Sequence, residues 1–228
     1  MIKILIGSLF TALVIILIVL GLVNYNSRYS DTPDKDKFSF LNQFPYELQD
    51  NPTMKYNLIF KIFASLVGAS YAVFGMYLFF FVDPYPYTFK NITEIVLGII
   101  FIVIGVNIFF EFNISLKNYK LHLITSSSLF ALTVCNYVLV GYYILFNGYV
   151  LVEASNQFPI ALSYVLFVIS AGLLASLIFT PLKKWMYLEK EEKDGTVRYY
   201  RKRISILPIM EWIFLLSNVL LIILLTIF

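Results

Sequence analysis

The stretch ITEIVLGIIFIVIGVNIFFEF, residues 92–112, is a continuous apolar run with charged side chains only near its ends, at Glu94 and Glu111. A helix of about 20 residues rises 1.5 Å per residue and crosses the ~30 Å hydrocarbon core of a bilayer. The stretch therefore predicts a transmembrane helix. Its two carboxylates stand about 25 Å apart along such a helix, so we expect one at each membrane surface and no carboxylate pair.

Five more apolar runs of this kind occur along the chain. Hydrophobic residues make up 60% of the 228 residues and charged residues 14%, whereas a globular protein has roughly 45–50% apolar residues. We predict an all-α polytopic protein, residues 1–228, in a cell inner, plasma or organellar membrane. The first run exceeds the 7–15 residues of a signal-peptide core and is expected to remain as an anchor. The five other predicted spans are 4–23, 57–82, 121–146, 159–180 and 204–228.

Lys and Arg residues are distributed unequally between the connections. Of the 17 in the chain, all except Lys3 and Lys90 lie in the first, third and fifth connections or at the adjoining span edges. Short cytoplasmic loops are enriched in Lys and Arg. The distribution predicts that these three connections are cytoplasmic and that both termini lie on the non-cytoplasmic side.

The fifth connection, KKWMYLEKEEKDGTVRYYRKR at residues 183–203, is the most basic segment. Interspersed acids leave no continuous basic face, so we expect no binding of nucleic acid. We interpret the segment as a topological anchor at anionic lipid headgroups, with docking of a cytoplasmic partner as the alternative. Asp194-Gly195 is compatible with a β-hairpin turn, and equally with a helix extension that ends at Gly195. The expected headgroup contacts are Lys183, Lys184, Arg198, Arg201, Lys202 and Arg203.

Small residues recur at helical spacing within three spans, and such residues allow transmembrane helices to approach closely. In the second span they lie at positions i, i+4, i+8 and i+11, on one helical face. We predict that this face packs against another helix, and that similar faces exist in the third and fifth spans. The residues are Ala64, Gly68, Ala72 and Gly75 in the second span, Gly98 and Gly105 in the third, and Ala171, Gly172 and Ala175 in the fifth.

Polar side chains inside the spans are few, and each needs a partner in hydrocarbon. We expect the amides of Asn107, Asn136 and Asn218 to face the bundle interior and to hydrogen-bond one another. Glu211 lies about 10 Å into the last span, and we expect it to pair with Arg201, Arg203 or Lys184. The hydroxyls of residues 125–128, TSSS, are expected to bond to carbonyls of their own helix.

The chain contains no recognisable catalytic or metal-binding pattern. Its one histidine, His122, and its one cysteine, Cys135, are separated by about 20 Å along the fourth span. We interpret Cys135 as a buried apolar residue. Walker A, GxSxG, HExxH and CxxC motifs are absent from the sequence. We therefore predict a non-enzymatic protein without a metal or cofactor.

The first connection, residues 24–56, is polar but contains the apolar-rich segment SFLNQFPYELQDNP at 39–52. A solvated loop rarely carries so many aromatic and aliphatic groups. We expect this segment to lie on the membrane surface or, alternatively, to contact a partner protein.

Two functions are compatible with this pattern. We favour a structural or interaction subunit of a membrane assembly, with a membrane-protein partner, because the spans show neither a deep charged group nor Gly/Pro-broken helices suited to ion coupling. The alternative is a small transporter or channel. Its polar path would use Asn107, Asn136, Asn218 and Glu211.

Overall fold

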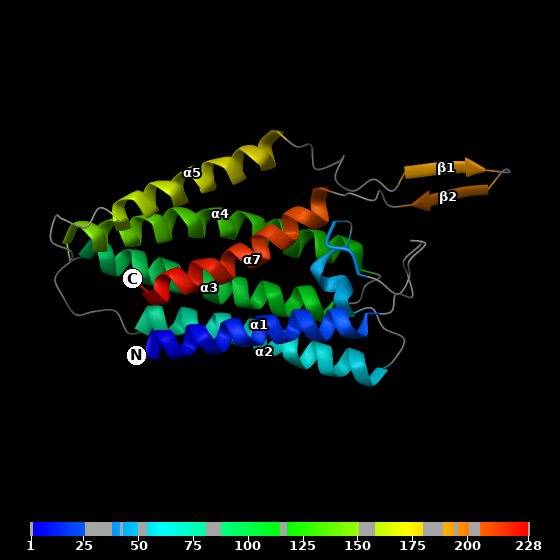
Figure 1. Ribbon diagram of the computed structural model, residues 1–228, viewed down its shortest axis with the longest axis horizontal. Coiled ribbons are helices and arrows are strands. Elements are labelled where there is room, and N and C mark those ends of the chain that lie inside the picture. The colour runs from blue at the N-terminus through cyan, green and yellow to red at the C-terminus, as the bar shows by residue number, and fades with distance from the viewer. Residues whose placement is uncertain are drawn as a thin grey trace.

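The computed structural model describes residues 2–25, 38–41, 43–49, 54–80, 88–114, 118–150, 158–179, 189–193, 196–200 and 206–227. Six long helices lie roughly along one axis (Figure 1). Each contains a segment long and apolar enough to cross a membrane, which confirms the predicted number of spans. The helices are α1 (Ile2–Asn24), α2 (Met54–Phe80), α3 (Thr88–Asn113), α4 (Tyr119–Val150), α5 (Phe158–Phe179) and α7 (Ile206–Ile227).

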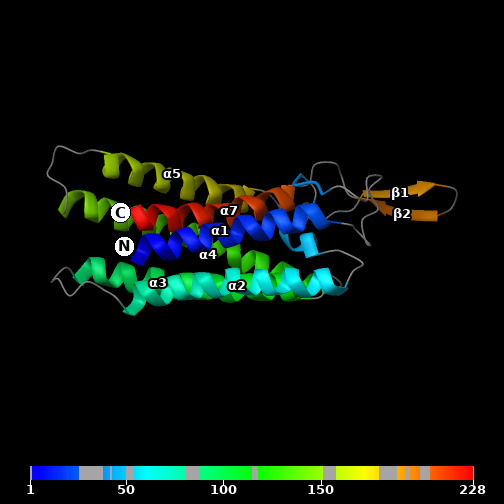
Figure 2. The same cartoon turned by 60° about the horizontal axis from the view of Figure 1, so that its bottom comes forward.

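Five of the helices form a closed ring of neighbours. The ring runs α1, α2, α3, α4, α7 and back to α1, while α5 packs mainly on the outside of α4 (Figures 1 and 2). Large aromatic side chains fill the interior, and Phe10, Tyr71 and Phe101 are fully buried. The N- and C-terminal ends of the chain lie at the same end of the bundle (Figure 1).

The contact between α2 and α3 is made by backbone against backbone. A Cβ atom added to Gly105 would lie 2.4 Å from the carbonyl oxygen of Gly68, and one added to Gly98 would lie 2.6 Å from that of Gly75. Only glycine permits this approach at the four positions. The small-residue face predicted for the second span is therefore the face that α2 presents to α3.

The small residues of α5 behave differently. Gly172 is exposed, and a Cβ atom added there would meet no described atom within 4 Å. Ala171 is exposed as well. The packing face predicted at this part of the fifth span was wrong, because α5 lies at the periphery of the bundle and has few neighbours.

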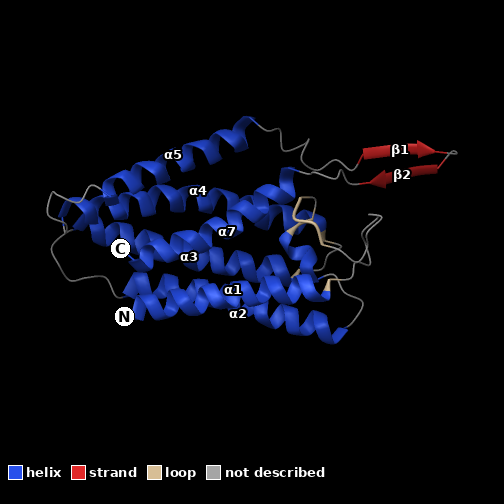
Figure 3. Cartoon of the chain, in the orientation of Figure 1, coloured by secondary structure: helices blue, strands red, loops and turns tan. Residues whose placement is uncertain are grey.

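The basic connection contains a β-hairpin rather than a helix extension. Strands β1 (Glu189–Lys193) and β2 (Thr196–Tyr200) pair antiparallel, from Glu189 opposite Tyr200 to Lys193 opposite Thr196. The hairpin lies beyond the end of the bundle opposite the termini (Figures 1 and 3). We call this end the hairpin end. Of the predicted headgroup contacts, Arg198 lies within β2, and the other five lie outside the described residues.

The first connection enters the hairpin end of the bundle. Its 3-10 helix η1 (Pro45–Gln49) contacts α1, α2, α3 and α7. Leu48 is 1% exposed and packs where Gly21 of α1 leaves room, and the Tyr56 hydroxyl donates to the Leu48 carbonyl. Phe40 and Leu41 remain exposed. The prediction that this segment lies on the membrane surface or on a partner was wrong for η1, because the segment buries its apolar side chains in its own bundle.

Candidate functional site

The hairpin end of the bundle contains a buried group of polar side chains from three helices. Glu111 comes from the last turn of α3 and Glu211 from the beginning of α7. Three residues of α4 lie between them, at positions i, i+3 and i+4, which share one helical face. We call the group Glu111, His122, Thr125, Ser126 and Glu211 the acid–histidine cluster. All five are buried, with His122 and Glu211 each 1% exposed.

Glu111 is held by two residues of α4. Nδ1 of His122 lies 3.3 Å from Oε1 of Glu111, and the hydroxyl of Thr125 donates to Oε2. The Thr125 hydroxyl also lies 2.9 Å from the His122 carbonyl of its own helix. The Glu111 carboxyl group of α3 therefore contacts both His122 and Thr125 in the first turns of α4.

Ser126 connects the two carboxyl groups. Its hydroxyl hydrogen-bonds Oε1 of Glu211 and lies 3.4 Å from Oε1 of Glu111. A hydroxyl has one proton to donate but can also accept. Ser126 can therefore donate to one carboxyl group and, when the other is protonated, accept from it. The cluster then forms a continuous hydrogen-bonded chain from His122 through Glu111 and Ser126 to Glu211.

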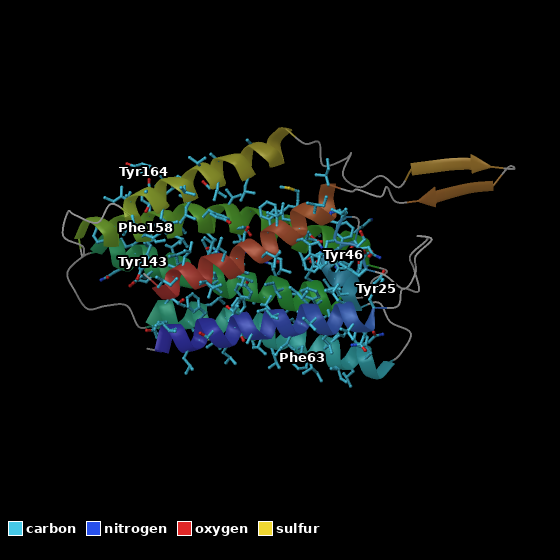
Figure 4. All side chains as sticks on the ribbon, viewed as in Figure 1. Tyr25, Tyr46, Phe63, Tyr143, Phe158 and Tyr164 are labelled. Carbon is cyan, nitrogen blue, oxygen red and sulfur yellow. The ribbon has the colours of Figure 1, made fainter. Side chains whose placement is uncertain are left out.

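Helix η1 covers the histidine. The ring of Tyr46 stacks on the His122 ring, with 3.9 Å between centroids and 14° between planes, and Phe44 stacks on Tyr46. Figure 4 places Tyr46 at the hairpin end, near Tyr25. This aromatic cover separates the imidazole from the outside of the bundle.

The segment that forms this aromatic cover is hydrogen-bonded to α7 at the residue next to Glu211. Nε1 of Trp212 donates to the Gln43 carbonyl at 3.0 Å, and the Gln43 amide donates to the Tyr25 hydroxyl. Phe38 and Phe40 make edge-to-face contacts with the Trp212 ring. Trp212, the residue next to Glu211 along α7, thus holds the first connection in place above the cluster.

Two atoms of the cluster have no hydrogen-bond partner among the described residues. They are Nε2 of His122 and Oε2 of Glu211, and both are buried. A buried polar group without a partner carries a desolvation cost, and each of these two atoms keeps the capacity for one more hydrogen bond. No group of three or more His, Cys, Asp or Glu side chains in the described ranges is placed to hold a metal ion.

The mid-span amides form a second polar group further along α4 and α7. The amide nitrogen of Asn136 donates to Oδ1 of Asn218 at 3.1 Å, and Asn218 donates to the Thr133 hydroxyl at 2.7 Å. The mutual hydrogen bond predicted for these amides is present. Asn107 does not join them, because it bonds Ser128 and its own helix at Val103.

Several site residues differ from their predicted settings. Glu111 lies in the last turn of α3, near the span end as predicted, but it is buried inside the bundle. Glu211 hydrogen-bonds Ser126, while its three predicted cationic partners lie outside the described residues. Thr125 bonds its own helix as expected but also Glu111. Cys135 is exposed, so its predicted burial was wrong.

Sequence reasoning missed that Glu111, His122 and Glu211 come together. One signal was available for Glu211, because an acid seven residues inside an apolar run carries a solvation cost that requires a partner. Positive-inside counting places the end of the third span, the beginning of the fourth and the beginning of the last at the same membrane face. This counting therefore assigns His122, Glu111 and Glu211 to the same side of the membrane.

Comparison with known proteins adds no assignment, since no family model, curated protein or solved structure matches the chain.

Proposed function

We propose that the chain is a non-enzymatic, proton-conducting membrane protein, a small transporter or channel in which Glu211 is the central group. The observation that carries the proposal is the burial of two carboxyl groups and an imidazole together, joined through Ser126. Ionisable groups inside transmembrane segments are costly and mark proton relays or ion pathways. A purely structural bundle has no need of such a group, and this favours the transporter or channel over the structural subunit.

The charge balance of the cluster favours a proton as the conducted ion. His122 is the one described side chain in the cluster that can carry a positive charge, against the two carboxyl groups of Glu111 and Glu211. With both acids ionised, the buried group would carry a net charge of −2 if His122 is neutral and −1 if His122 is protonated, which is expensive in a medium of low dielectric. One proton on His122 and one on a carboxyl group together neutralise it.

The geometry also suits a proton better than a metal cation. A metal ion requires several ligand atoms directed at one point, whereas a proton needs only pairs of groups within hydrogen-bond reach. The cluster supplies such pairs through Thr125 and Ser126, and the described residues supply no metal-binding group.

A route toward the opposite membrane face would follow the contact between α4 and α7. His122 and Asn136 are separated by about 21 Å along α4, and Glu211 and Asn218 by about 10 Å along α7. The two polar groups therefore occupy successive levels of one helix–helix contact, as the predicted polar path requires. Asn107, which bonds Ser128 at the contact of α3 with α4, lies off this route.

Proton flux into liposomes tests the proposal. The purified protein would be reconstituted with an internal pH-sensitive dye, and flux would be started by a potassium diffusion potential. We expect flux well above that of empty liposomes, and its loss in Glu211→Gln. Glu94→Gln is the matched control, because Glu94 is also a buried acid and lies at the end of α3 away from the cluster. Equal flux in wild type and Glu211→Gln, or none in either, contradicts the proposal.

An interaction subunit of a membrane assembly, with a membrane-protein partner, is the second candidate. It is favoured by the hairpin, in which β1 and β2 pair only with each other among the described strands. An unpaired strand edge offers backbone donors and acceptors to a strand of another protein. If this candidate is right, deleting residues 189–200 abolishes a stoichiometric complex isolated in mild detergent and leaves the bundle folded.

For orientation we propose that the hairpin end is cytoplasmic and both termini are on the opposite side, in a cell inner, plasma or organellar membrane. The support is the concentration of Lys and Arg in connections at the hairpin end. Single cysteines placed in a Cys135→Ala background report the side of each connection. Neutralising Arg198, Arg201, Lys202 and Arg203 is expected to disturb insertion of α7, and unchanged accessibility would contradict their role as an anchor.

A further inference from the structure

A groove runs along the lipid-facing side of the α2–α3 contact. It encloses about 660 Å³, within the roughly 300–1,000 Å³ typical of small-ligand sites. Its lining includes Gly68, Ala69 and Gly105, where the two backbones touch and no large side chain fills the surface. Leu58 and Phe109 also line it and are exposed on the bundle surface. The groove is therefore apolar, elongated and open to the hydrocarbon.

The hairpin end of this groove is polar. Lys61 lines it there, together with Ser65 and Asn113, and the Asn113 amide nitrogen lies 3.2 Å from the Ser65 hydroxyl. Lys61 belongs to the first turns of α2 and has no carboxylate within ion-pair distance among the described residues. A lysine inside a membrane-spanning segment directs its ammonium group toward the headgroup layer.

We propose that this groove is a binding site for an anionic phospholipid of the leaflet at the hairpin end. One acyl chain would lie over Gly68 and Ala69, along the roughly 16 Å from Lys61 to Ala72. The phosphate would be held by the Lys61 ammonium. The Ser65 hydroxyl and the Asn113 amide lie beside it as polar surface, because they already donate to the Lys61 carbonyl and to the Phe109 carbonyl and Ser65. Charge complementarity selects this occupant, because an apolar groove alone would accept any chain, whereas an unpaired cation at its headgroup end favours a negative one.

The site is independent of the acid–histidine cluster. None of its lining residues belongs to the cluster, and it opens to lipid on α2 and α3 rather than toward α4 and α7. Loss of lipid binding and loss of proton flux are therefore separate results.

Native mass spectrometry in a neutral detergent tests the headgroup contact. Phosphatidylglycerol and phosphatidylcholine with identical chains would be titrated onto the purified protein. We expect tighter binding of phosphatidylglycerol, weakened about fivefold by Lys61→Gln, the factor that one cation contributes at an anionic surface. Lys120→Gln is the charge control, since Lys120 is an exposed lysine at the start of α4 outside the groove. Equal affinity for both lipids, or an unchanged affinity in Lys61→Gln, overturns the proposal.

A second pair of variants tests the acyl-chain contact. Ala69→Phe fills the groove and is expected to abolish retention of both lipids at this site. Val73→Phe adds the same ring to an exposed position of α2 that does not line the groove, and is expected to leave binding unchanged. Retained lipid in Ala69→Phe overturns the proposal. If that variant instead converts a dimer to a monomer with lipid binding intact, the groove belongs to a second copy and the proposal is likewise overturned.

Discussion

The α2–α3 contact and the α4–α7 contact join neighbouring helices by different means. The first brings Gly68 against Gly105 and Gly75 against Gly98, with backbone oxygens in the contact. The second contains side-chain hydrogen bonds, from Ser126 to Glu211 and from Asn136 to Asn218. In lipid both solutions are available, since helix association relies on close packing and polar bonds rather than on a hydrophobic driving force. The first contact therefore depends on the shape of the two backbones, and the second depends on directional hydrogen bonds between side chains.

The glycine contact is expected to tolerate change least. In Gly105→Ala the new Cβ would lie 2.4 Å from the Gly68 carbonyl oxygen and 2.9 Å from the Ala72 amide nitrogen. Neither backbone atom can rotate away, so we expect a loss of about 3 kcal/mol in the free energy of unfolding, at the upper end for overpacking. Unfolding in mixed detergent micelles measures it. Gly172→Ala is the control, with a change near zero, and equal stability of the two variants would contradict the backbone contact.

This contact was predictable because it is encoded within single helices. Ala64, Gly68, Ala72 and Gly75 share a face by spacing alone, and Gly98 and Gly105 belong to the next span. The same rule failed at Gly172, because spacing does not show whether a helix lies inside the ring or at its edge. The number of spans was predictable for a similar reason, since hydropathy and length are local properties.

The acid–histidine cluster was not predictable in this way. The bond between Ser126 and Glu211 joins residues 85 positions apart, and Glu111 reaches His122 across a connection. Each residue alone has an ordinary interpretation. Glu111 can be an acid at the membrane surface, His122 a histidine at the start of a helix, and Ser126 a serine that bonds a carbonyl of its own helix. Burial of η1 was missed because an apolar loop segment has the same composition whether it covers a membrane, a partner or its own bundle.

Helix η1, which covers the hairpin end of the α4–α7 contact, is expected to show an intermediate effect on the free energy of unfolding. Leu48→Ala removes a side chain that is 1% exposed and packed at Gly21. We expect a loss of about 2 kcal/mol, at the lower end for Leu→Ala, because η1 lies at the end of the bundle and can settle into the space. The mixed-micelle assay measures this change too. Leu41→Ala, in the same connection but 50% exposed, should change stability little. Equal losses would show that the segment is held by membrane or partner instead.

The hydrogen bond between Asn136 and Asn218 in the α4–α7 contact is expected to make the smallest contribution to the free energy of unfolding. A double-mutant cycle with Asn136→Ala and Asn218→Ala isolates the hydrogen bond between them, which is 3.1 Å long. We expect a coupling free energy of about 0.6 kcal/mol, the average for such bonds between membrane helices. The cycle of Asn107→Ala with Asn218→Ala should give zero, because these residues bond different partners. A coupling above about 2 kcal/mol would contradict the expectation that this hydrogen bond has the strength usual between membrane helices.

The central claim, that the buried cluster binds a proton, is tested most directly by infrared spectroscopy of the carboxyl C=O stretch during a pH titration of the purified protein. We predict a protonated-carboxyl band that disappears in Glu211→Gln, shifts in Ser126→Ala because that change removes the hydroxyl bonded to Glu211, and persists in Glu94→Gln. A spectrum of Glu211→Gln identical to that of the wild type throughout the titration would contradict the claim.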